Sequence, residues 1–361
     1  MLLTTEFTDM IFNCYKSKFD KLDLLFNQET NSKIKSVNIF INLESILNKL
    51  HIGDVEDWLS AMKKSEKRKY HYSIIVNIFN LAAHYRRYFT KNKIKSNIVF
   101  FMNDYDKYSN FNNKLFIPEY RDKFIYNYTQ NIKYTSINYI LSVVVKNIRL
   151  ISDYIENVYY VSTDRLESSI IPELILNKLD GKINLLITSD EYDLQYVNKN
   201  FLIIYRYYDK MSIITKKNLF NFLCEKYEIK PKYELPNYIL TFALSVTGSK
   251  RRSIPKIPGW SWKSIYKAIW KLYQETDISE NEIVQLEHLI AAIKKEDKKE
   301  IITNNYMCTD IDRQCKMVSD SQLTSVTQQL KDLYEFDVLK DLNERYFTEE
   351  PIMIQELNQY K

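Results

Sequence analysis

The sequence predicts an α/β protein in which a parallel β-sheet is flanked by helices and followed by a wholly helical C-terminal part. Short apolar runs alternate with stretches of helical periodicity between residues 37 and 205, which is the pattern of βαβ units. Beyond about residue 235 only helical patterns remain. The chain of 361 residues is long enough to build a large core.

The expected strands are apolar throughout, as buried parallel strands are. They cover residues 37–41, 97–102, 158–161, 183–187 and 201–205. Helices are expected at 43–90, 120–156, 167–179, 264–274 and 280–295. Parallel sheets place working residues at the carboxyl ends of their strands. The polar residues at those ends are Asn42, Asn103, Asp104, Ser162, Thr163, Asp164, Ser189 and Asp190.

Composition excludes several classes of protein. The net charge of +5 permits a nucleic-acid partner without requiring one. The cysteines form no CxxC pair, so a zinc site is not expected, and no glycine-rich phosphate loop is present. The chain starts without the pattern of a signal peptide, and no apolar run reaches the length of a membrane span. We therefore expect a soluble protein without a membrane partner, either cytoplasmic or assembled in a particle.

Residues 248–264 form the most informative segment, because two of the four glycines lie there. The Pro-Gly pair at 258–259 predicts a chain reversal, and Ser261 can cap the helix that follows. Three cations then share one helix face at a spacing of four residues: Lys263, Lys267 and Lys271. Amides at a helix N-terminus together with cations favour binding of a phosphate backbone.

This segment resembles the helix-three-turn-helix of the flap endonuclease and 5′–3′ exonuclease family. The family pattern is Gly-Asp-x-Ser-Asp-Asn-Ile-Pro-Gly-Val-Pro-Gly-Ile-Gly-Pro-Lys-Thr-Ala, and the segment aligns with it without a gap. Ile257 is a conservative change and Ser264 stands for Thr. The identical positions are Gly248, Ile254, Pro255, Pro258, Gly259 and Lys263. The resemblance extends over roughly residues 37–275 and implies a PIN-like core with a helical arch near 105–150.

The resemblance divides the chain into four parts. These are an N-terminal extension (1–36), a PIN-like domain with its arch (37–235), a helix-three-turn-helix region (236–300) and an acidic helical tail (301–361). The two terminal parts have no family counterpart that we can assign, and we expect them to contact protein partners. The 29 Tyr and 4 Gly, with many Ile, Asn and Lys, are typical of an AT-rich genome such as that of many bacteriophages and other viruses. The expected location is then the host cytoplasm or a virus particle.

The family cleaves phosphodiesters with divalent ions, normally Mg²⁺, which bind to several carboxylates. Most of the corresponding positions lack a carboxylate here: Asn42, Ser169, Ile170, Tyr192, Ser249 and Arg252. Arg252 places a permanent cation where the family has a ligand. The remaining candidate metal ligands are Glu167, Asp190 and Asp104. Glu44, Glu191 and Asp193 are alternatives if the alignment shifts by one residue. We expect no cofactor, and Mg²⁺ or Mn²⁺ only if the protein is active.

The basic character of the segment is retained. Nucleic-acid contacts are expected from Gly248, Lys250, Arg251, Arg252, Lys256, Gly259, Lys263 and Lys267. Trp260 and Trp262 lie among these cations, where they can serve DNA binding or pack in the core.

The leading interpretation is a catalytically inactive, flap-endonuclease-like protein. It would bind duplex or branched DNA, or serve as a structural or assembly component of a virus particle. One alternative is an active, divergent, divalent-metal-dependent 5′–3′ exonuclease or flap endonuclease. The other is an unrelated α/β protein with a coincidental turn motif.

Overall fold

The structure is a computed structural model. It describes residues 12–13, 15–16, 34–47, 63–103, 144–153, 155–163, 166–207, 210–231, 234–237, 239–249, 254–276, 286–293 and 296–330. Most of the expected arch (105–150) and the tail beyond residue 330 lie outside these ranges, as do Asp104 and Asp164.

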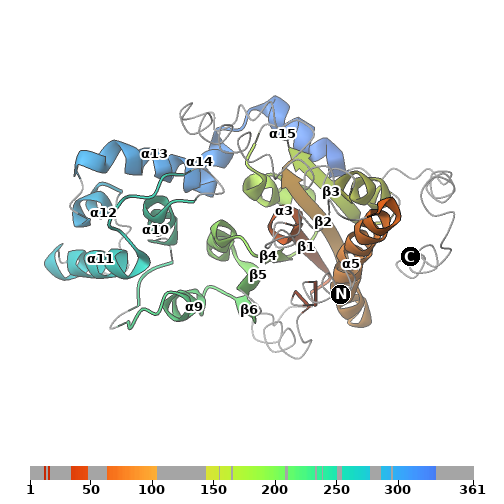
Figure 1. The fold of residues 1–361 in the computed structure, drawn as a ribbon, viewed down its shortest axis with the longest axis horizontal. Coiled ribbons are helices and arrows are strands. Elements are labelled where there is room, and N and C mark those ends of the chain that lie inside the picture. Colours follow the sequence, from red (N-terminus) through yellow and green to blue (C-terminus); the bar gives the residue numbers. More distant parts are fainter. Residues whose placement is uncertain are drawn as a thin grey trace.

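The centre of the fold is a six-stranded sheet in the order β3-β2-β1-β4-β5-β6 (Figure 1). The strands are β1 (Ser36–Asn42), β2 (Lys95–Asn103), β3 (Val158–Thr163), β4 (Ile183–Thr188), β5 (Phe201–Tyr207) and β6 (Lys210–Ile214). Neighbours from β3 to β5 pair in parallel, and β6 pairs antiparallel to β5. The predicted parallel sheet and its five strands are therefore confirmed. The edge strand β6 was missed because its half-exposed residues give no apolar run.

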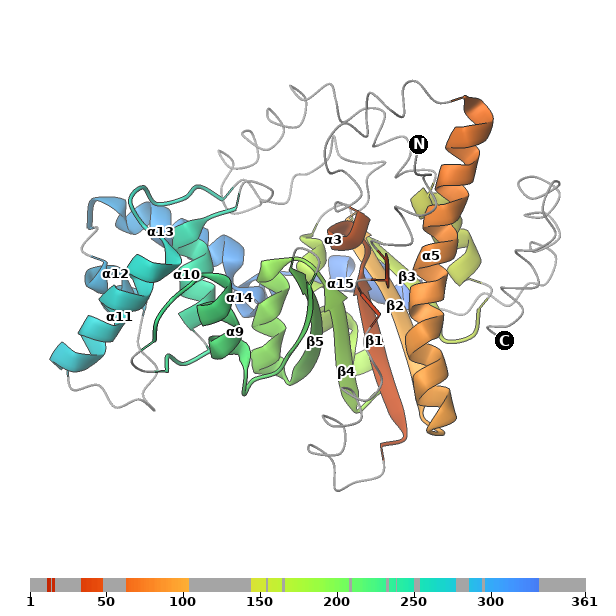
Figure 2. The same cartoon turned by 60° about the horizontal axis from the view of Figure 1, so that its bottom comes forward.

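Alternate residues of β1 supply the two faces of the sheet. Val37, Ile39 and Ile41 are fully buried beneath the long helix α5 (Lys64–Lys91), whose position along one face is visible in Figure 2. Phe40 points to the opposite face, where its ring lies 5.5 Å from that of Phe201. Burial on both faces explains why the central strands consist of nearly unbroken apolar runs.

The connection after β3 is helical over most of the predicted range 167–179, but as three successive short segments instead of one α-helix. It consists of η3 (Ser168–Ile170), α8 (Ile171–Ile175) and η4 (Leu176–Lys178). Pro172 lies in the first turn of α8. Because proline has no amide hydrogen to donate, it is accepted at a helix start and interrupts a continuous helix.

The other named helices are mostly short. They are α3 (Leu43–Leu47), η5 (Glu191–Lys199), α9 (Leu219–Lys226), α10 (Ile239–Thr247), α11 (Trp262–Thr276), α12 (Leu286–Ala292), η6 (Glu296–Lys298), α13 (Lys299–Thr309), α14 (Ile311–Lys316), α15 (Asp320–Thr327) and η7 (Gln328–Leu330). A separate apolar cluster holds α9 to α13 together. None of the described helices combines the length and apolarity that a bilayer crossing requires.

The C-terminal helices return from this helical region to the sheet (Figure 1). Ile311 and Val326 are buried in the cluster that covers the face of Phe40. Gln329 then pairs with the backbone of Ser162 in the edge strand β3: its Oε1 accepts from the amide at 3.0 Å and its Nε2 donates to the carbonyl at 2.9 Å. The side chain therefore satisfies backbone groups that an edge strand leaves unpaired.

A buried amide network lies near the amino ends of the central strands. Asn38 Nδ2 donates to Gly181 O at 3.1 Å, and its Oδ1 accepts from Gly181 N at 3.1 Å. A Cβ atom on Gly181 would lie 2.2 Å from Asn38 Oδ1 and 2.6 Å from Asn38 N. Glycine is required here because β1 and the chain entering β4 approach so closely.

We predict that Gly181→Ala lowers the free energy of unfolding by about 1–3 kcal/mol, the usual effect of overpacking. Urea denaturation of the variant and the wild type measures this change. The control is Asn177→Ala, at an exposed position in the same connection, which should change stability by less than about 0.5 kcal/mol. Equal stability of Gly181→Ala and the wild type would show that the close approach is not a constraint.

Candidate nucleic-acid interface and polar edge

The carboxyl ends of four neighbouring strands meet at one edge of the sheet. In spatial order they are Thr163 of β3, Asn103 of β2, Asn42 of β1 and Thr188 of β4, and all four are buried. The first turn of α3 continues directly from β1 at this edge (Figure 2). We call these strand ends, with the residues of α3, η3 and η5 that bind them, the polar edge.

Asp193 of η5 is the fully buried carboxylate of the polar edge. Its Oδ2 accepts a hydrogen bond of 2.6 Å from Asn42 Nδ2 and one of 2.5 Å from Thr188 Oγ1. Hydrogen bonds from neutral donors favour the ionised form of a buried carboxyl. A carboxylate at position 42 would instead face this oxygen with a like charge, so Asn42 supplies attraction where an Asp would supply repulsion.

Glu44 of α3 is the second buried carboxylate of the edge. Its Oε2 accepts from Asn103 Nδ2 at 2.9 Å and from Ser168 Oγ at 3.0 Å. The Ser168 amide donates in turn to Asn103 Oδ1 at 2.9 Å. Glu44 thus connects the ends of β1 and β2 to the start of η3 through an amide and a hydroxyl.

Ser45 links the two halves of the edge. Its amide donates to Asn42 Oδ1 at 2.9 Å, an N-cap interaction that begins α3. Its hydroxyl oxygen accepts from the Ser189 amide at 3.0 Å, and its carbonyl accepts from Ser189 Oγ at 2.9 Å. The loop after β4 is therefore fastened to the helix after β1.

The predicted metal ligands occupy different parts of this edge. Asp190 is buried and caps η5, where its Oδ1 accepts from the Tyr192 amide at 3.1 Å. Glu167 is half-buried at the N-cap position of η3. Strands β2 and β1 separate β3, which precedes Glu167, from β4, which precedes Asp190. Asp104 lies outside the described residues, and the assignment of these three ligands stays a prediction.

The described residues of the polar edge do not assemble the donor set of a two-ion centre. Two Mg²⁺ ions need several carboxylates to offset their mutual repulsion. The described strand ends supply amides and hydroxyls, and these donate to one oxygen each of Glu44 and Asp193. Across the described part of the chain, no three His, Cys, Asp or Glu side chains converge in a group that could hold a metal ion.

The segment between α10 and α11 forms a defined turn where the structure describes it. Ser249 and Ile254 exchange two backbone hydrogen bonds of 2.8 and 2.9 Å. Gly248 has φ = +66°, and a Cβ atom there would lie 2.6 Å from Ile254 O, so only glycine fits. The Ser264 amide donates to Ser261 Oγ at 3.4 Å, and the Ser261 amide donates to Ser264 Oγ at 2.7 Å. The expected Ser261 cap is confirmed.

The turn presents cations to solvent. Lys256, Lys263 and Lys267 are exposed, and Gly259 between them is exposed with φ = +80°. Lys263 Nζ lies 3.3 Å from a Glu228 carboxylate oxygen in a solvent-exposed pair, which contributes little to stability. The other three predicted cations, Lys250, Arg251 and Arg252, fall outside the described residues. The nucleic-acid contacts assigned from the sequence stay a prediction.

The two tryptophans of this segment contribute to packing. Trp260 and Trp262 are half-buried against the cluster that holds α9 to α13. The Trp262 ring stacks on Tyr227 at 4.7 Å and 17°. Tyr227 donates its hydroxyl hydrogen to Glu191, the first residue of η5, so a chain of contacts connects the polar edge to the first residue of α11.

A buried cation supports this connection. Lys226 Nζ lies 3.2 Å from Glu191 Oε2 and donates to Tyr205 Oη at 3.1 Å. It also lies 5.0 to 5.2 Å from the ring centres of Tyr205, Tyr207 and Tyr227. Burial lowers the pKa of Lys226, and the negative charge of Glu191 opposes that shift. Burial also raises the pKa of Tyr227.

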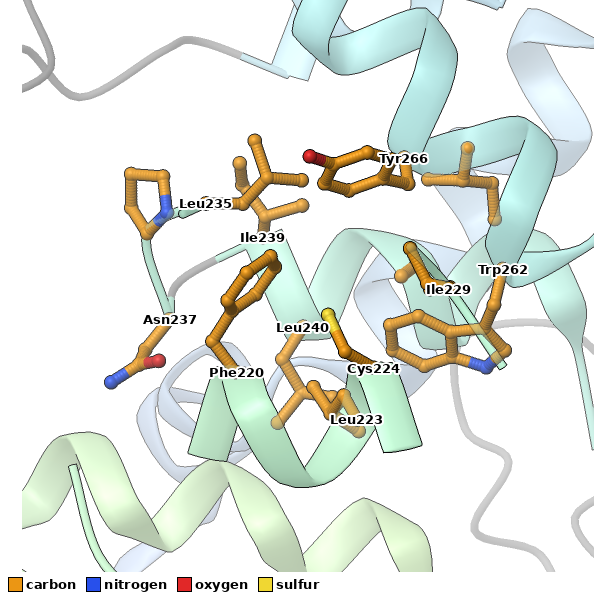
Figure 3. Close-up of a pocket in the computed structure, with 13 residues that line it drawn as sticks. Phe220, Leu223, Cys224, Ile229, Leu235, Asn237, Ile239, Leu240, Trp262 and Tyr266 are labelled. Carbon is orange, nitrogen blue, oxygen red and sulfur yellow. The ribbon is translucent and has the colours of Figure 1, made fainter. Parts of the chain in front are cut away.

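A small apolar cavity of about 30 Å³ lies between α9, α10 and α11 (Figure 3). Phe220, Ile239, Trp262 and Tyr266 line it, together with the thiol of Cys224. Burial raises the pKa of Cys224, so its reactive thiolate form is disfavoured. The cavity is a packing defect of the helical region and not a site of polar chemistry.

Comparison with known proteins supports the fold. No protein-family model matches the chain, and no curated protein matches it either. A bacteriophage T5 5′-exonuclease with bound zinc superposes with a TM-score of 0.51 at 10% identity, over 86% of this chain and 98% of that one. A bacteriophage T5 flap endonuclease, in a pseudo-enzyme–product complex with DNA and metal ions, gives 0.50 at 12% identity over the same shares. The chain therefore has a flap-nuclease fold.

We predict that Asn42→Asp destabilises the protein at neutral pH, by about 1–3 kcal/mol for removal of the buried hydrogen bond together with the added repulsion. Acidification should restore part of this stability because one of the paired carboxyls then binds a proton. Thermal unfolding between pH 5 and 8, with and without Mg²⁺, measures the effect.

The matched control is Asn77→Asp, at a buried position of α5 where the amide donates to Ser73 O at 3.0 Å. Mg²⁺ should stabilise Asn42→Asp more than this control, since only the former creates a carboxylate pair. Wild-type stability of Asn42→Asp at pH 7, in the absence of divalent ions, would contradict our description of the polar edge.

Proposed function

We propose that this protein binds duplex or branched DNA through the turn between α10 and α11 and does not cleave it. The observation that carries the proposal is a contrast between two parts of the fold. The described part of the turn has paired backbone groups and exposed cations, whereas neutral donors bind one oxygen each of Glu44 and Asp193 at the polar edge.

The turn suits a phosphate backbone. Lys256 and Lys263 flank Gly259, and a Cβ atom built on Gly259 meets nothing within 4 Å. The backbone is thus open to close approach by a ligand from outside. Cations beside a helix N-terminus bind phosphates through charge and through amide hydrogens. Such contacts position a duplex without reading its sequence.

Among its described residues, the polar edge does not gather the group of carboxylates that two-metal hydrolysis would need, and this supports a binding role. Two-metal catalysis requires carboxylates that hold ions beside the attacking and leaving oxygens. Asn42 and Asn103 offer amides at the ends of the two central strands, and both already donate to the carboxylates nearby. We infer no hydrolytic step at this edge. The similar fold of a T5 flap endonuclease solved with DNA supports DNA as the ligand class.

We predict that Lys256→Glu/Lys263→Glu lowers the affinity for duplex DNA at least tenfold at low salt. The slope of log K against log [salt] should become shallower by about 0.9 for each phosphate that the variant no longer neutralises. Fluorescence anisotropy with a labelled duplex and a labelled 5′-flap DNA measures both quantities.

The matched control is Lys35→Glu/Lys182→Glu, which makes the same change in net charge at exposed positions beside the amino ends of β1 and β4. It should retain the wild-type salt dependence. An equal decrease in affinity in the two double variants would mean that net charge, and not the turn, controls binding. Absence of DNA binding by the wild type at low salt would refute the proposed function.

A further inference from the structure

Asn305 lies in α13, 50 residues beyond the basic turn, yet it contacts both sides of that turn. Its Nδ2 donates to Ser245 O and to Pro255 O, each at 2.7 Å. Ser245 lies near the C-terminal end of α10, and Pro255 immediately precedes Lys256. One side-chain nitrogen thus joins the helix before the turn to the strand-like segment within it.

The carbonyl of Ser245 depends on a donor from outside its own helix. The carbonyls in the last turn of a helix have no partner within the helix, and Ser245 belongs to that turn of α10. Asn305 is fully buried, so water cannot replace its two N–H groups. An unpaired carbonyl in such a position carries a desolvation penalty.

The surrounding contacts hold Asn305 in place. Ile302, one turn earlier in α13, is fully buried in the cluster that contains Val246 and Ile257. Thr309 donates its hydroxyl hydrogen to Asn305 O at 2.7 Å. The amide therefore projects from a packed helix, and the geometry of the turn follows the position of α13.

We propose that Asn305 is a positioning residue for nucleic-acid binding, because it holds Pro255, and with it the adjacent Lys256, against the end of α10. This inference rests on the proposed function of the turn. It also gives the C-terminal helices a role in DNA affinity, although they present none of the predicted DNA contacts. Asn305→Asp retains the size of the side chain, removes both donors and sets a carboxylate against two carbonyl oxygens.

The test compares the full-length wild type, Asn305→Asp and the matched control Gln314→Glu. Gln314 is buried in α14 and donates one amide hydrogen bond of 2.7 Å to Cys308 O, away from the turn. Binding to a labelled 5′-flap DNA is measured across a salt series, at a temperature where all three proteins are folded. Trypsin cleavage in the segment 250–256 is measured without DNA.

We expect Asn305→Asp to bind the 5′-flap DNA at least tenfold more weakly than the wild type. The slope of log K against log [salt] should be shallower by about 0.9 for each phosphate that the variant no longer neutralises. Trypsin should cut its turn faster than that of the control. Gln314→Glu should retain the wild-type slope and cleavage rate, even if it lowers the melting temperature. If Asn305→Asp does not fold, Asn305→Ser takes its place, because serine keeps one donor and adds no charge. Asn305→Ser should show smaller changes of the same sign in DNA affinity, salt slope and trypsin cleavage rate.

An unchanged slope and an unchanged cleavage rate in folded Asn305 variants would overturn the inference while leaving the proposed function intact. The same shift in Gln314→Glu would overturn it too, because any weakening of the C-terminal helices would then suffice. A wild type that does not bind DNA would overturn both proposals. Faster trypsin cleavage of Asn305→Asp would then show only that Asn305 stabilises the turn.

Discussion

A fully buried carboxylate that accepts two neutral hydrogen bonds sets the conditions for the polar edge. Asp193 lies in η5, just beyond the end of β4, and is fully buried. A buried charge of this kind requires donors or a cation. Asn42 and Thr188 donate from the adjacent ends of β1 and β4 and tie η5 to the sheet. The same residues place amides, and not carboxylates, at the ends of β1 and β2.

The strands were predictable because a parallel strand buried on both faces leaves an unmistakable apolar run. The prediction failed where a local constraint overrode periodicity. Pro172 divides the expected helix into short pieces, and β6 was missed because it is half-exposed. The turn before α11 was predictable for a different reason, since positive φ and close backbone contact both require glycine at position 248.

The residues of the polar edge and of the turn could be predicted only in part from the sequence. The amides of Asn42 and Asn103 follow directly from their places at strand ends. Their partners do not: Asp193 lies five residues past β4 in a 3₁₀ helix, and both Asp193 and Glu44 were only alternatives to the predicted ligands. Asn305 had no sequence signal, because a contact across 50 residues depends on how α13 packs. Hydrogen-bond partners are set by tertiary structure, and residue type alone does not specify them.

Incubation of the purified protein with a 5′-flap DNA and a 5′-overhang duplex, first in Mg²⁺ and then in Mn²⁺, shows whether the protein cleaves DNA. Asp190→Ala and Asp193→Ala serve as controls, because each removes a carboxylate from the loop after β4 or from η5. Our account predicts no cleavage by the wild type beyond that of the two variants, with DNA binding retained. Metal-dependent cleavage that either substitution abolishes would contradict it, and would show that the few carboxylates of the polar edge suffice for hydrolysis.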